Sequence, residues 1–312
     1  MQAMNLDLCN NGEEAKAISI DMLLERTALS RPYFSFRHLY TLPENEWDVY
    51  GEVRSERYLG AEIGPITVAE ACRHLIILGA CAGVIKSDPV PAVCFRPACA
   101  VWQRHRSSGG GELRGSLTCR ARVLDRGPAT LKSEIQICDG DAGIGTLLTQ
   151  YYALRMTSFD YIFSEAKRVT LKEDWGDPYA NQIQMAFSSS DSARIFGRSE
   201  GYGPDYSAGY FHNYPMWSLA SITRAIEQST TKILQRMFGP QVKYEIDFSA
   251  IHGVELIPAS ETLEFETSVM HRDGGRCAVS SRVRYRAKEI AEVHSTLVLV
   301  DESHDPTRPS RW

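Results

Sequence analysis

The stretch GYFHNYPMWSLASITRAIEQ (209–228) carries side chains suited to proton chemistry. His212 has an imidazole that titrates near neutral pH, and Tyr210 is a weaker acid two positions before it. A second stretch, VAEACRH (68–74), places Glu70 in an otherwise apolar helical pattern. Burial raises the pKa of a carboxyl group, so a buried Glu70 could exchange a proton near neutral pH. An imidazole or phenol facing that carboxyl group would form an acid–base pair.

Both His212 and Glu70 also have a purely structural interpretation. Glu70 could pair with Arg73 three residues later on the same helix face, which would offset the cost of burying its charge. His212 could be a hydrogen-bonded packing residue in a loop rich in tyrosine. The two interpretations of each residue stay open on the sequence alone.

The elements that must position these residues occur in the same order twice along the chain. Two helical patterns, 66–86 and 218–238, are each followed by four β-like segments, several with period-2 alternation. The β-like segments are 92–105, 112–124, 128–138 and 143–156 after the first helix, and 242–254, 261–271, 276–286 and 291–300 after the second. Further strand candidates precede the helices at 34–40, 46–56, 181–187 and 193–201. The helix starts lie 152 residues apart (66 to 218) and the turns at Asp125 and Asp273 lie 148 apart, so the registers agree.

This order predicts an α+β protein built from two similar halves. An antiparallel sheet wrapped around one apolar helix is a stable two-layer unit, and two such units can pair edge to edge. We expect two antiparallel sheets, each wrapped around one long central helix, in a first half at 31–164 and a second half at 181–303. Residues 165–180 would form a linker, and residues 1–30 and 304–312 would be peripheral. The alternative is an unrelated pair of α+β domains.

The layout and the stretch at 209–228 resemble the hot-dog β-hydroxyacyl-ACP dehydratases, in a fused, double hot-dog form. Those enzymes carry Gly-His-Phe-Pro-x-x-Pro, then Met-Pro-Gly, then an Asp or Glu in Ala-Met-x-Gln on the helix. Laid on this chain without gaps, the motif is matched by Gly209, Phe211, Pro215, Ala225 and Gln228. Tyr210 falls at the family's catalytic His and Arg224 at its acid, and Ser218-Leu219 replace the Pro-Gly.

The resemblance implies one composite site between the halves. In hot-dog dimers each site takes its His from one subunit and its acid from the helix of the other. Here Glu70 matches the acid and His74 the Gln, so the loop of the second half would face the helix of the first. The opposite pairing, of SERYLGAE (55–62) with Arg224, would be inactive. Whether Tyr210 or His212 faces Glu70 stays open.

The resemblance also assigns roles to the residues around that site. The amides at the start of the second helix, around Met216–Leu219, would stabilise negative charge on a thioester carbonyl. Arg224 is either a salt-bridge residue or a contact to the phosphopantetheine arm. The catalytic residues expected are His212, Glu70 and Tyr210, and the substrate-binding residues expected are Arg73, Phe211, Asn213, Tyr214, Pro215, Met216, Trp217, Ser218, Leu219 and Arg224.

By resemblance, the expected function is processing of an acyl thioester carried by acyl carrier protein or CoA. Dehydration of a β-hydroxyacyl intermediate in polyketide or fatty-acid-like biosynthesis is the first interpretation. A thioesterase, an isomerase or a butenolide-synthesis-type acyltransferase on the same fold is the alternative. The substitutions at Tyr210 and Arg224 also allow a non-catalytic acyl-binding protein.

Composition and spacing exclude several other classes. The net charge of −5 gives no basic field for nucleic acid, and no apolar run reaches the roughly 18–20 residues that span a bilayer. Neither RSSGGGE (106–112) nor EGYGPDYSAGY (200–210) has phosphate-loop spacing; the first fits a hairpin turn and the second a mobile loop beside an acyl channel. The eight cysteines lack CxxC spacing and the histidines lack ligand spacing, so we expect reduced cysteines and neither a metal nor another cofactor. No secretory signal is visible, which predicts a cytoplasmic protein, and a homodimer is a further expectation.

Overall fold

A computed structural model describes residues 15–43, 45–56, 59–85, 93–105, 115–164, 179, 181–201, 207–211 and 214–300. His212, Asn213, the RSSGGGE segment and the tail at 304–312 lie outside the described residues, as do residues 202–206 and all of the predicted linker except Tyr179.

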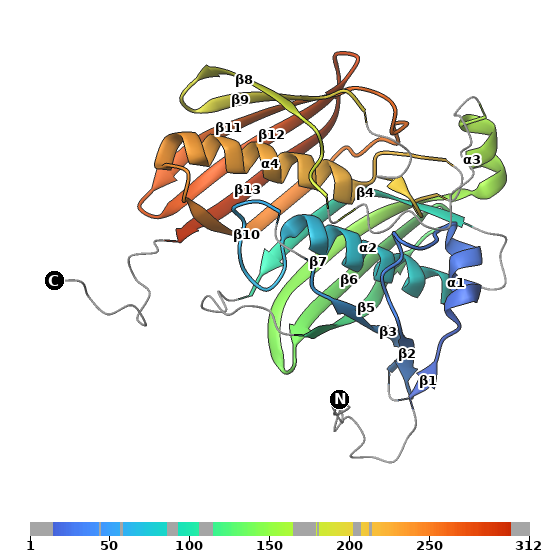
Figure 1. The fold of residues 1–312 in the computed structure, drawn as a ribbon. Helices are drawn as coiled ribbons and strands as arrows, with labels where there is room; N and C mark the ends of the chain where they lie inside the picture. Colours follow the sequence, from blue (N-terminus) through green and yellow to red (C-terminus); the bar gives the residue numbers. More distant parts are fainter. Residues whose placement is uncertain are drawn as a thin grey trace.

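The strands of the described chain form one antiparallel sheet (Figure 1). Their bounds are β1 Lys16–Ala17, β2 Leu39–Leu42, β3 Asn45–Arg54, β4 Val93–Arg104, β5 Ser116–Arg126, β6 Thr130–Asp139, β7 Ala142–Arg155, β8 Ala186–Asp191, β9 Arg194–Ser199, β10 Lys243–His252, β11 Leu263–Asp273, β12 Arg276–Tyr285 and β13 Lys288–Val300. The order across the sheet is β1-β2-β3-β5-β6-β7-β4-β10-β13-β12-β11-β9-β8. The strands predicted after each long helix are therefore confirmed, whereas the segment 34–40 becomes a strand only from Leu39.

Read outward from the β4–β10 pair, the two halves have the same strand order, and the first half has the short β1 in addition. Residues 99–103 of β4 pair with 248–252 of β10, so the halves meet edge to edge as predicted. This pairing joins the two expected sheets into one continuous sheet. Bulges recur at matching places: Ala98 in β4 and Asp247 in β10, and Leu124 in β5 and Met270 in β11, are each the extra residue of a bulge.

Two long helices and two short ones accompany this sheet in the described chain: α1 Ile20–Thr27, α2 Val68–Ile85, α3 Met156–Ile162 and α4 Leu219–Phe238. Ser218 caps the start of α4, since its hydroxyl accepts a hydrogen bond from the Ser221 amide at 3.1 Å, and Gly239, with φ of 100°, caps its end. Helix α2 is apolar nearly all round, which predicts burial on every side. By length and composition it could also span a membrane, but it is buried inside the protein, as core helices are.

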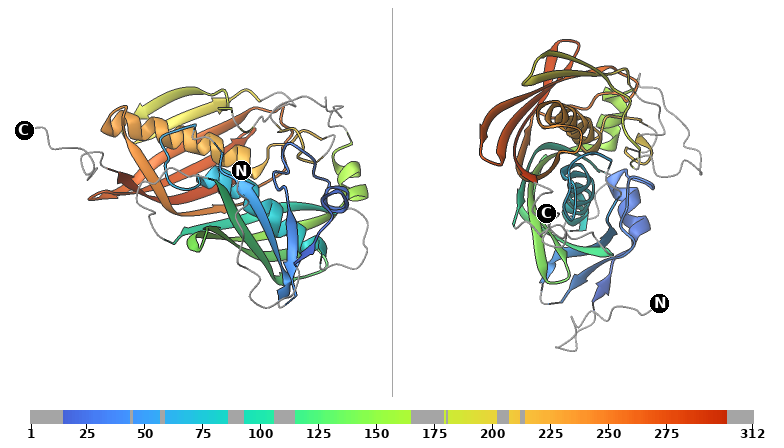
Figure 2. Two further views of the ribbon diagram at one scale, coloured as in Figure 1. Left: turned by 60° about the horizontal axis from the view of Figure 1, so that its bottom comes forward. Right: turned by 60° about the vertical axis from the view of Figure 1, so that its left-hand side comes forward.

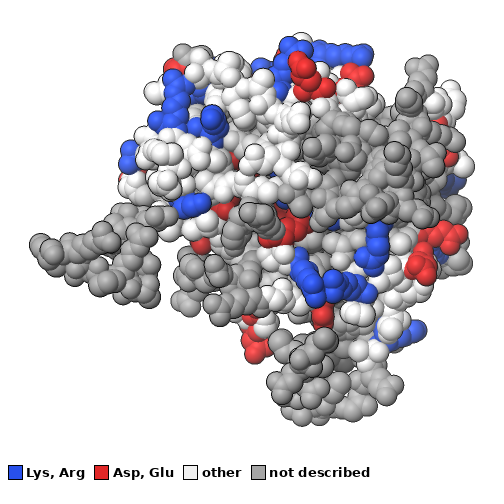
Figure 3. Space-filling model, in the orientation of Figure 1, with Lys and Arg blue, Asp and Glu red and all other residues white. Residues whose placement is uncertain are grey.

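Each long helix lies in the hollow of its own half of the sheet, and the helices touch each other (Figure 2). Helix α2 contacts β3, β5 and β6 most, and α4 contacts β11 and β9. Helix α1 packs on α2 through the fully buried Leu23, so the described part of segment 1–30 contributes to the core. On the face in Figure 3, side chains of both charge signs are interspersed.

Candidate active site

A cluster of buried charged residues lies where α2 and α4 meet. It joins the segment after β3 to both helices, and each side chain is at most 11% exposed where it forms an ion pair. Burying a charge costs free energy unless another charge compensates it. Buried ionisable groups that accept this cost are often found at functional sites. The residues of this buried charge cluster are Glu56, Glu70, Arg73, His74, Arg224 and Glu227.

Glu56 is the centre of the cluster because it binds both arginines. Its Oε1 accepts a hydrogen bond from Arg73 on α2, and its Oε2 accepts one from Arg224 Nη2 on α4 at 3.2 Å. Burial alone would raise the pKa of Glu56, but Arg73, His74 and Arg224 together outweigh burial and lower it. Glu56 is therefore the ionised anchor of the cluster.

Glu70 and His74 lie one helical turn apart on α2 and face Glu56. The Glu56 amide donates to Glu70 Oε1 at 2.6 Å, and His74 Nε2 lies 3.6 Å from the same oxygen and 3.5 Å from Glu56 Oε1. The other ring nitrogen of His74, Nδ1, forms a hydrogen bond of 2.6 Å with the Ser35 hydroxyl. Burial raises the pKa of Glu70, and His74 offsets this only in part. Glu70 can thus hold or release a proton beside an imidazole.

Two more buried carboxyl groups lie nearby, Glu227 on α4 and Glu62 just before α2. Burial raises the pKa of Glu227 to about 7; Arg224 opposes the rise, and Glu70 and Glu56 add to it. Burial and the repulsion of Glu227 raise the pKa of Glu62 well above its ordinary value. Glu62 Oε1 accepts from the Val68 amide at the start of α2 at 2.9 Å.

A cavity of about 520 Å³ reaches the edge of the cluster at Gly60. A Cβ atom at Gly60 would lie 2.8 Å from Glu227 Oε1 and 3.0 Å from Thr231 Oγ1. Any larger residue at position 60 would therefore clash with the Glu227 carboxyl group, which lies directly behind the cavity wall. Gln228, the motif glutamine, lines the same cavity.

The N-cap residues of α2 and α4 give an alignment of the two helices that differs from the alignment by sequence motif. Thr67 caps α2, with its hydroxyl accepting from the Glu70 amide at 3.2 Å, as Ser218 caps α4. Aligning the two caps places Arg73 opposite Arg224, and these are the two arginines that bind Glu56. The sequence interpretation that placed Glu70 and Arg224 at one equivalent position is therefore wrong by three residues.

The loop of the second half does reach the first half, as the composite site requires. The Tyr210 and Tyr33 ring centroids are 4.9 Å apart, and the Tyr33 carbonyl accepts from Arg73 Nε at 3.1 Å. The Tyr33 hydroxyl interacts with the Ser218 side chain at the start of α4. Tyr33 thus links Tyr210, Arg73 and the start of α4, although sequence reasoning had assigned it no role.

The remaining predicted binding residues surround the start of α4. Phe211 is fully buried with φ of 54° and packs on Phe159 at 5.1 Å between ring centroids, so it fills the core. The Trp217 amide donates to the Ile257 carbonyl at 2.8 Å and is not available to a substrate. The amides of Leu219 and Ala220, in the first turn of α4, have no acceptor among the described residues. Tyr214, Met216 and Ser218 are buried around them, and Pro215 is partly buried.

The structure adds two residues to the predicted site and identifies the ion-pair partner of two predicted ones. Glu56 and Glu227 were not singled out, because acidic residues in a loop and on an amphipathic helix are ordinarily solvated. Arg224 forms the salt bridge that was one of its two predicted roles. Arg73 pairs with Glu56 rather than Glu70, so the predicted Glu70–Arg73 pair is not formed. Among the described residues, no three His, Cys, Asp or Glu side chains are grouped to hold a metal ion.

Comparison with known proteins defines the fold. No protein-family model matches the chain, and no curated protein sequence matches it. A putative oleoyl thioesterase from Lactobacillus plantarum is similar in structure, with 12% identity, a TM-score of 0.55 and coverage of 82% of this chain and 97% of that one. The tesB protein of Mycobacterium avium subs paratuberculosis has 11% identity and a TM-score of 0.52, over 91% of this chain and 100% of that one.

A third similar structure is a conserved protein of unknown function with a hot-dog fold from Alicyclobacillus acidocaldarius. It has 9% identity and a TM-score of 0.50, over 90% of this chain and 98% of that one. The chain therefore has the hot-dog fold.

Proposed function

We propose that this protein is an enzyme that processes acyl thioesters, built from two tandem hot-dog units, and that it hydrolyses its substrate to a carboxylic acid and a thiol. The observation that carries this proposal is the buried charge cluster between α2 and α4. Three carboxyl groups there face two arginines, and burial raises the pKa of Glu70 and Glu227. A structural salt bridge needs only Glu56 and the arginines. Proton transfer near neutral pH is a reason to bury the other two carboxyl groups.

Hydrolysis requires a base for water, donors for the oxyanion and an exit for the thiol. Glu70, next to His74, is the proposed base that takes a proton as water attacks the thioester carbon. The free amides of Leu219 and Ala220 at the start of α4 are the proposed donors for the carbonyl oxygen. The C–S bond then breaks, and the leaving sulfur takes the proton from Glu70. The cavity beside Gly60 is the proposed approach for the substrate.

Dehydration of a β-hydroxyacyl thioester is the second candidate. Tyr210 lies against Tyr33, whose carbonyl binds Arg73, so the motif loop and the first-half helix are neighbours. In this reaction an acid–base pair removes the α-proton and protonates the leaving hydroxyl group. His212 and Tyr210 are the proposed partners of Glu70, and Arg224 would contribute by holding Glu56.

One assay separates the two candidates. The purified protein is incubated with saturated and 3-hydroxyacyl thioesters of CoA and of acyl carrier protein, and thiol release and enoyl absorbance are followed together. Thiol release supports hydrolysis, and enoyl formation without thiol supports dehydration. If neither product forms with any of the four substrates, a non-catalytic acyl-binding protein is the better assignment.

The catalytic role of Glu70 is tested with Glu70→Gln. The amide keeps an oxygen for the Glu56 N–H, so the thermal midpoint should change little, while kcat should fall about a hundredfold or more because the base is lost. Glu289→Gln, on the exposed end of β13, is the matched control and should keep full activity. Full activity of Glu70→Gln would rule out the proposed base. His212→Ala should abolish dehydration and spare hydrolysis.

A further inference from the structure

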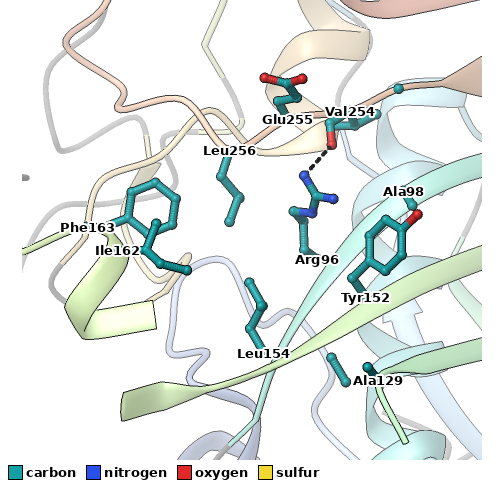
Figure 4. Close-up of a pocket in the computed structure, with 12 residues that line it drawn as sticks. Arg96, Ala98, Ala129, Tyr152, Leu154, Ile162, Phe163, Val254, Glu255 and Leu256 are labelled. Atoms are coloured by element: carbon teal, nitrogen blue, oxygen red, sulfur yellow. Dashed lines mark hydrogen bonds between the residues drawn. The ribbon is translucent and has the colours of Figure 1, made fainter. Parts of the chain in front are cut away.

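A second cavity, of about 710 Å³, lies away from the buried charge cluster (Figure 4). It is bounded by β4, β7, the end of α3 and the segment after β10, where the two halves adjoin. Its walls include Arg96, Tyr152, Leu154, Ile162, Phe163 and Leu256. No residue of the cluster lines it, so binding here does not depend on chemistry there.

Small residues and a bulge create the space. Ala98, Ala129 and Ala153 line the cavity and leave room that larger side chains would fill. Ala98 is the extra residue of the β4 bulge, which interrupts the β4–β7 ladder. Ile162, at the end of α3, is 58% exposed and offers apolar surface at the rim of the cavity.

Arg96 is the one cation among the described residues that line this cavity. Its Nη1 donates to the Val254 carbonyl at 3.2 Å, and its guanidinium carbon lies 4.9 Å from the Tyr152 ring centroid. These contacts hold the head group in place, while its other N–H groups have no acceptor among the described residues. The Glu255 carboxyl group turns away from Arg96 (Figure 4) and binds Lys288 at 2.8 Å and 3.0 Å. Arg96 therefore forms no ion pair among the described residues, and its remaining donors are available to a ligand.

We propose that this cavity binds a single-chain carboxylate such as a fatty acid. The carboxylate pairs with the free donors of Arg96, and the alkyl chain lies along Leu154, Leu256, Ile162 and Phe163. The volume is in the range of small-molecule sites, and one positioned cation in an apolar wall is typical of a site for an amphiphilic anion. Covering Ile162 and its neighbours removes exposed apolar surface and drives the binding.

The test is calorimetric titration of the full chain with dodecanoate, dodecan-1-ol and dodecylammonium, each at micromolar concentration. Dodecanoate should bind saturably with one site, and the alcohol and the amine should bind at least about tenfold more weakly because they lack the anion. Arg96→Gln should weaken dodecanoate about tenfold or more and leave the alcohol unchanged. Arg96→Lys keeps the charge and should retain most of the binding.

Two neighbouring residues of α3 provide a matched pair of variants. Ile162→Glu places a negative charge in the cavity wall and should abolish dodecanoate binding. Tyr161→Glu makes the same change one residue earlier, at a side chain that is 84% exposed and does not line the cavity, and should bind normally. Thermal melts of all variants confirm folding.

Three results would overturn the proposal. The first is equal affinity for dodecanoate and dodecan-1-ol, because Arg96 would then not recognise the carboxylate. The second is dodecanoate binding that is absent in the wild type or unchanged in both Arg96→Gln and Ile162→Glu. The third is a concentration-dependent dimer that Ile162→Glu abolishes, because the cavity would then be an interface between two copies of the chain.

Discussion

Three carboxyl groups share the space between α2 and α4, and their protonation determines what the cluster can do. Glu56 is ionised because two arginines bind it. Burial raises the pKa of Glu70 and of Glu227, and repulsion adds to the rise, from Glu56 at Glu70 and from Glu70 and Glu56 at Glu227. A proton held by either of these two removes that repulsion. The same groups that suit proton transfer therefore also make the stability of the fold depend on pH.

The free energy of unfolding of Glu227→Gln should exceed that of the wild type by an amount that grows as the pH rises. Burial raises the pKa of Glu227 from 4.5 to about 7, so between these values the folded state binds more protons than the unfolded state. Wild-type stability that is fully present below about pH 4.5 is consequently lost as the pH rises through 7. Urea unfolding at several pH values should show wild type and variant similar near pH 5 and the variant more stable at pH 8.

The control for this measurement is Glu25→Gln, an exposed glutamate on α1. The difference in free energy of unfolding between Glu25→Gln and the wild type should be the same at each pH of the series. A difference between Glu227→Gln and the wild type that is constant from pH 5 to pH 8 would contradict the raised pKa.

Sequence patterns reveal a buried charge only when its neighbours along the chain are apolar. Glu70 stood out because helix 68–85 is apolar almost throughout. Glu227 lies on the amphipathic α4, and Glu56 lies in a polar segment, so neither differs in pattern from a solvated residue. Their burial results from the packing of α2 against α4, which unites residues up to 171 positions apart, from 56 to 227. No local pattern records such long-range contacts.

The loop before α4 is held against the first half by close backbone contact at Gly209. Its φ of +86° is strained for any other residue, and its carbonyl accepts from the Ser30 amide at 2.9 Å. A Cβ atom there would lie 2.3 Å from the Ser30 carbonyl oxygen and 2.7 Å from the Tyr33 nitrogen, both backbone atoms that cannot rotate away. The glycine therefore determines how closely the loop approaches Tyr33.

Gly209→Ala should displace this loop and lower both stability and turnover. Strain at a positive φ and overpacking against backbone each cost about 1–3 kcal/mol, so a loss of at least about 2 kcal/mol is expected in urea unfolding. Gly274→Ala is the matched control, since its φ is +56° but no heavy atom lies within 4 Å of the added Cβ. The control should lose about 1 kcal/mol and keep full turnover. Equal effects of the two variants would show that the contact with Ser30 and Tyr33 is not important.

Regular elements were predictable where periodicity was strong, and connections were not. Alternation identified β4–β7 and β10–β13, and the capped, periodic stretches identified α2 and α4. Segment 34–40 has the apolar residues of a strand, but Phe34 and Phe36 are buried in irregular backbone that packs on α2 through His74. Tertiary packing thus overrides strand propensity there.

Backbone pairing and a buried ionic contact are two of the connections between the halves. Strand β4 pairs with β10 across the centre of the sheet, and Glu56 of the first half binds Arg224 of the second while also binding Arg73. The sequence predicted the first connection from the repeated order of elements. It assigned the pairing of 55–62 with Arg224 to an inactive site, whereas Glu56 binds the arginines of both halves in one cluster. The cluster therefore belongs to the whole molecule rather than to either half.

Glu56→Gln should destabilise the whole protein in a single unfolding transition. The change removes the carboxylate charge that binds the buried Arg224 and one of the contacts of Arg73, and breaking such a buried pair costs about 3–5 kcal/mol. Calorimetry should show one transition at a lower midpoint, because the lost contact joins the halves.

Glu255→Gln is the control. It removes the exposed pair with Lys288 and should cost at most about 1 kcal/mol. In a double-mutant cycle with Arg224→Met, the second change should cost much less in Glu56→Gln than in the wild type. Additive losses, or two separate transitions, would show that Glu56 does not couple the halves.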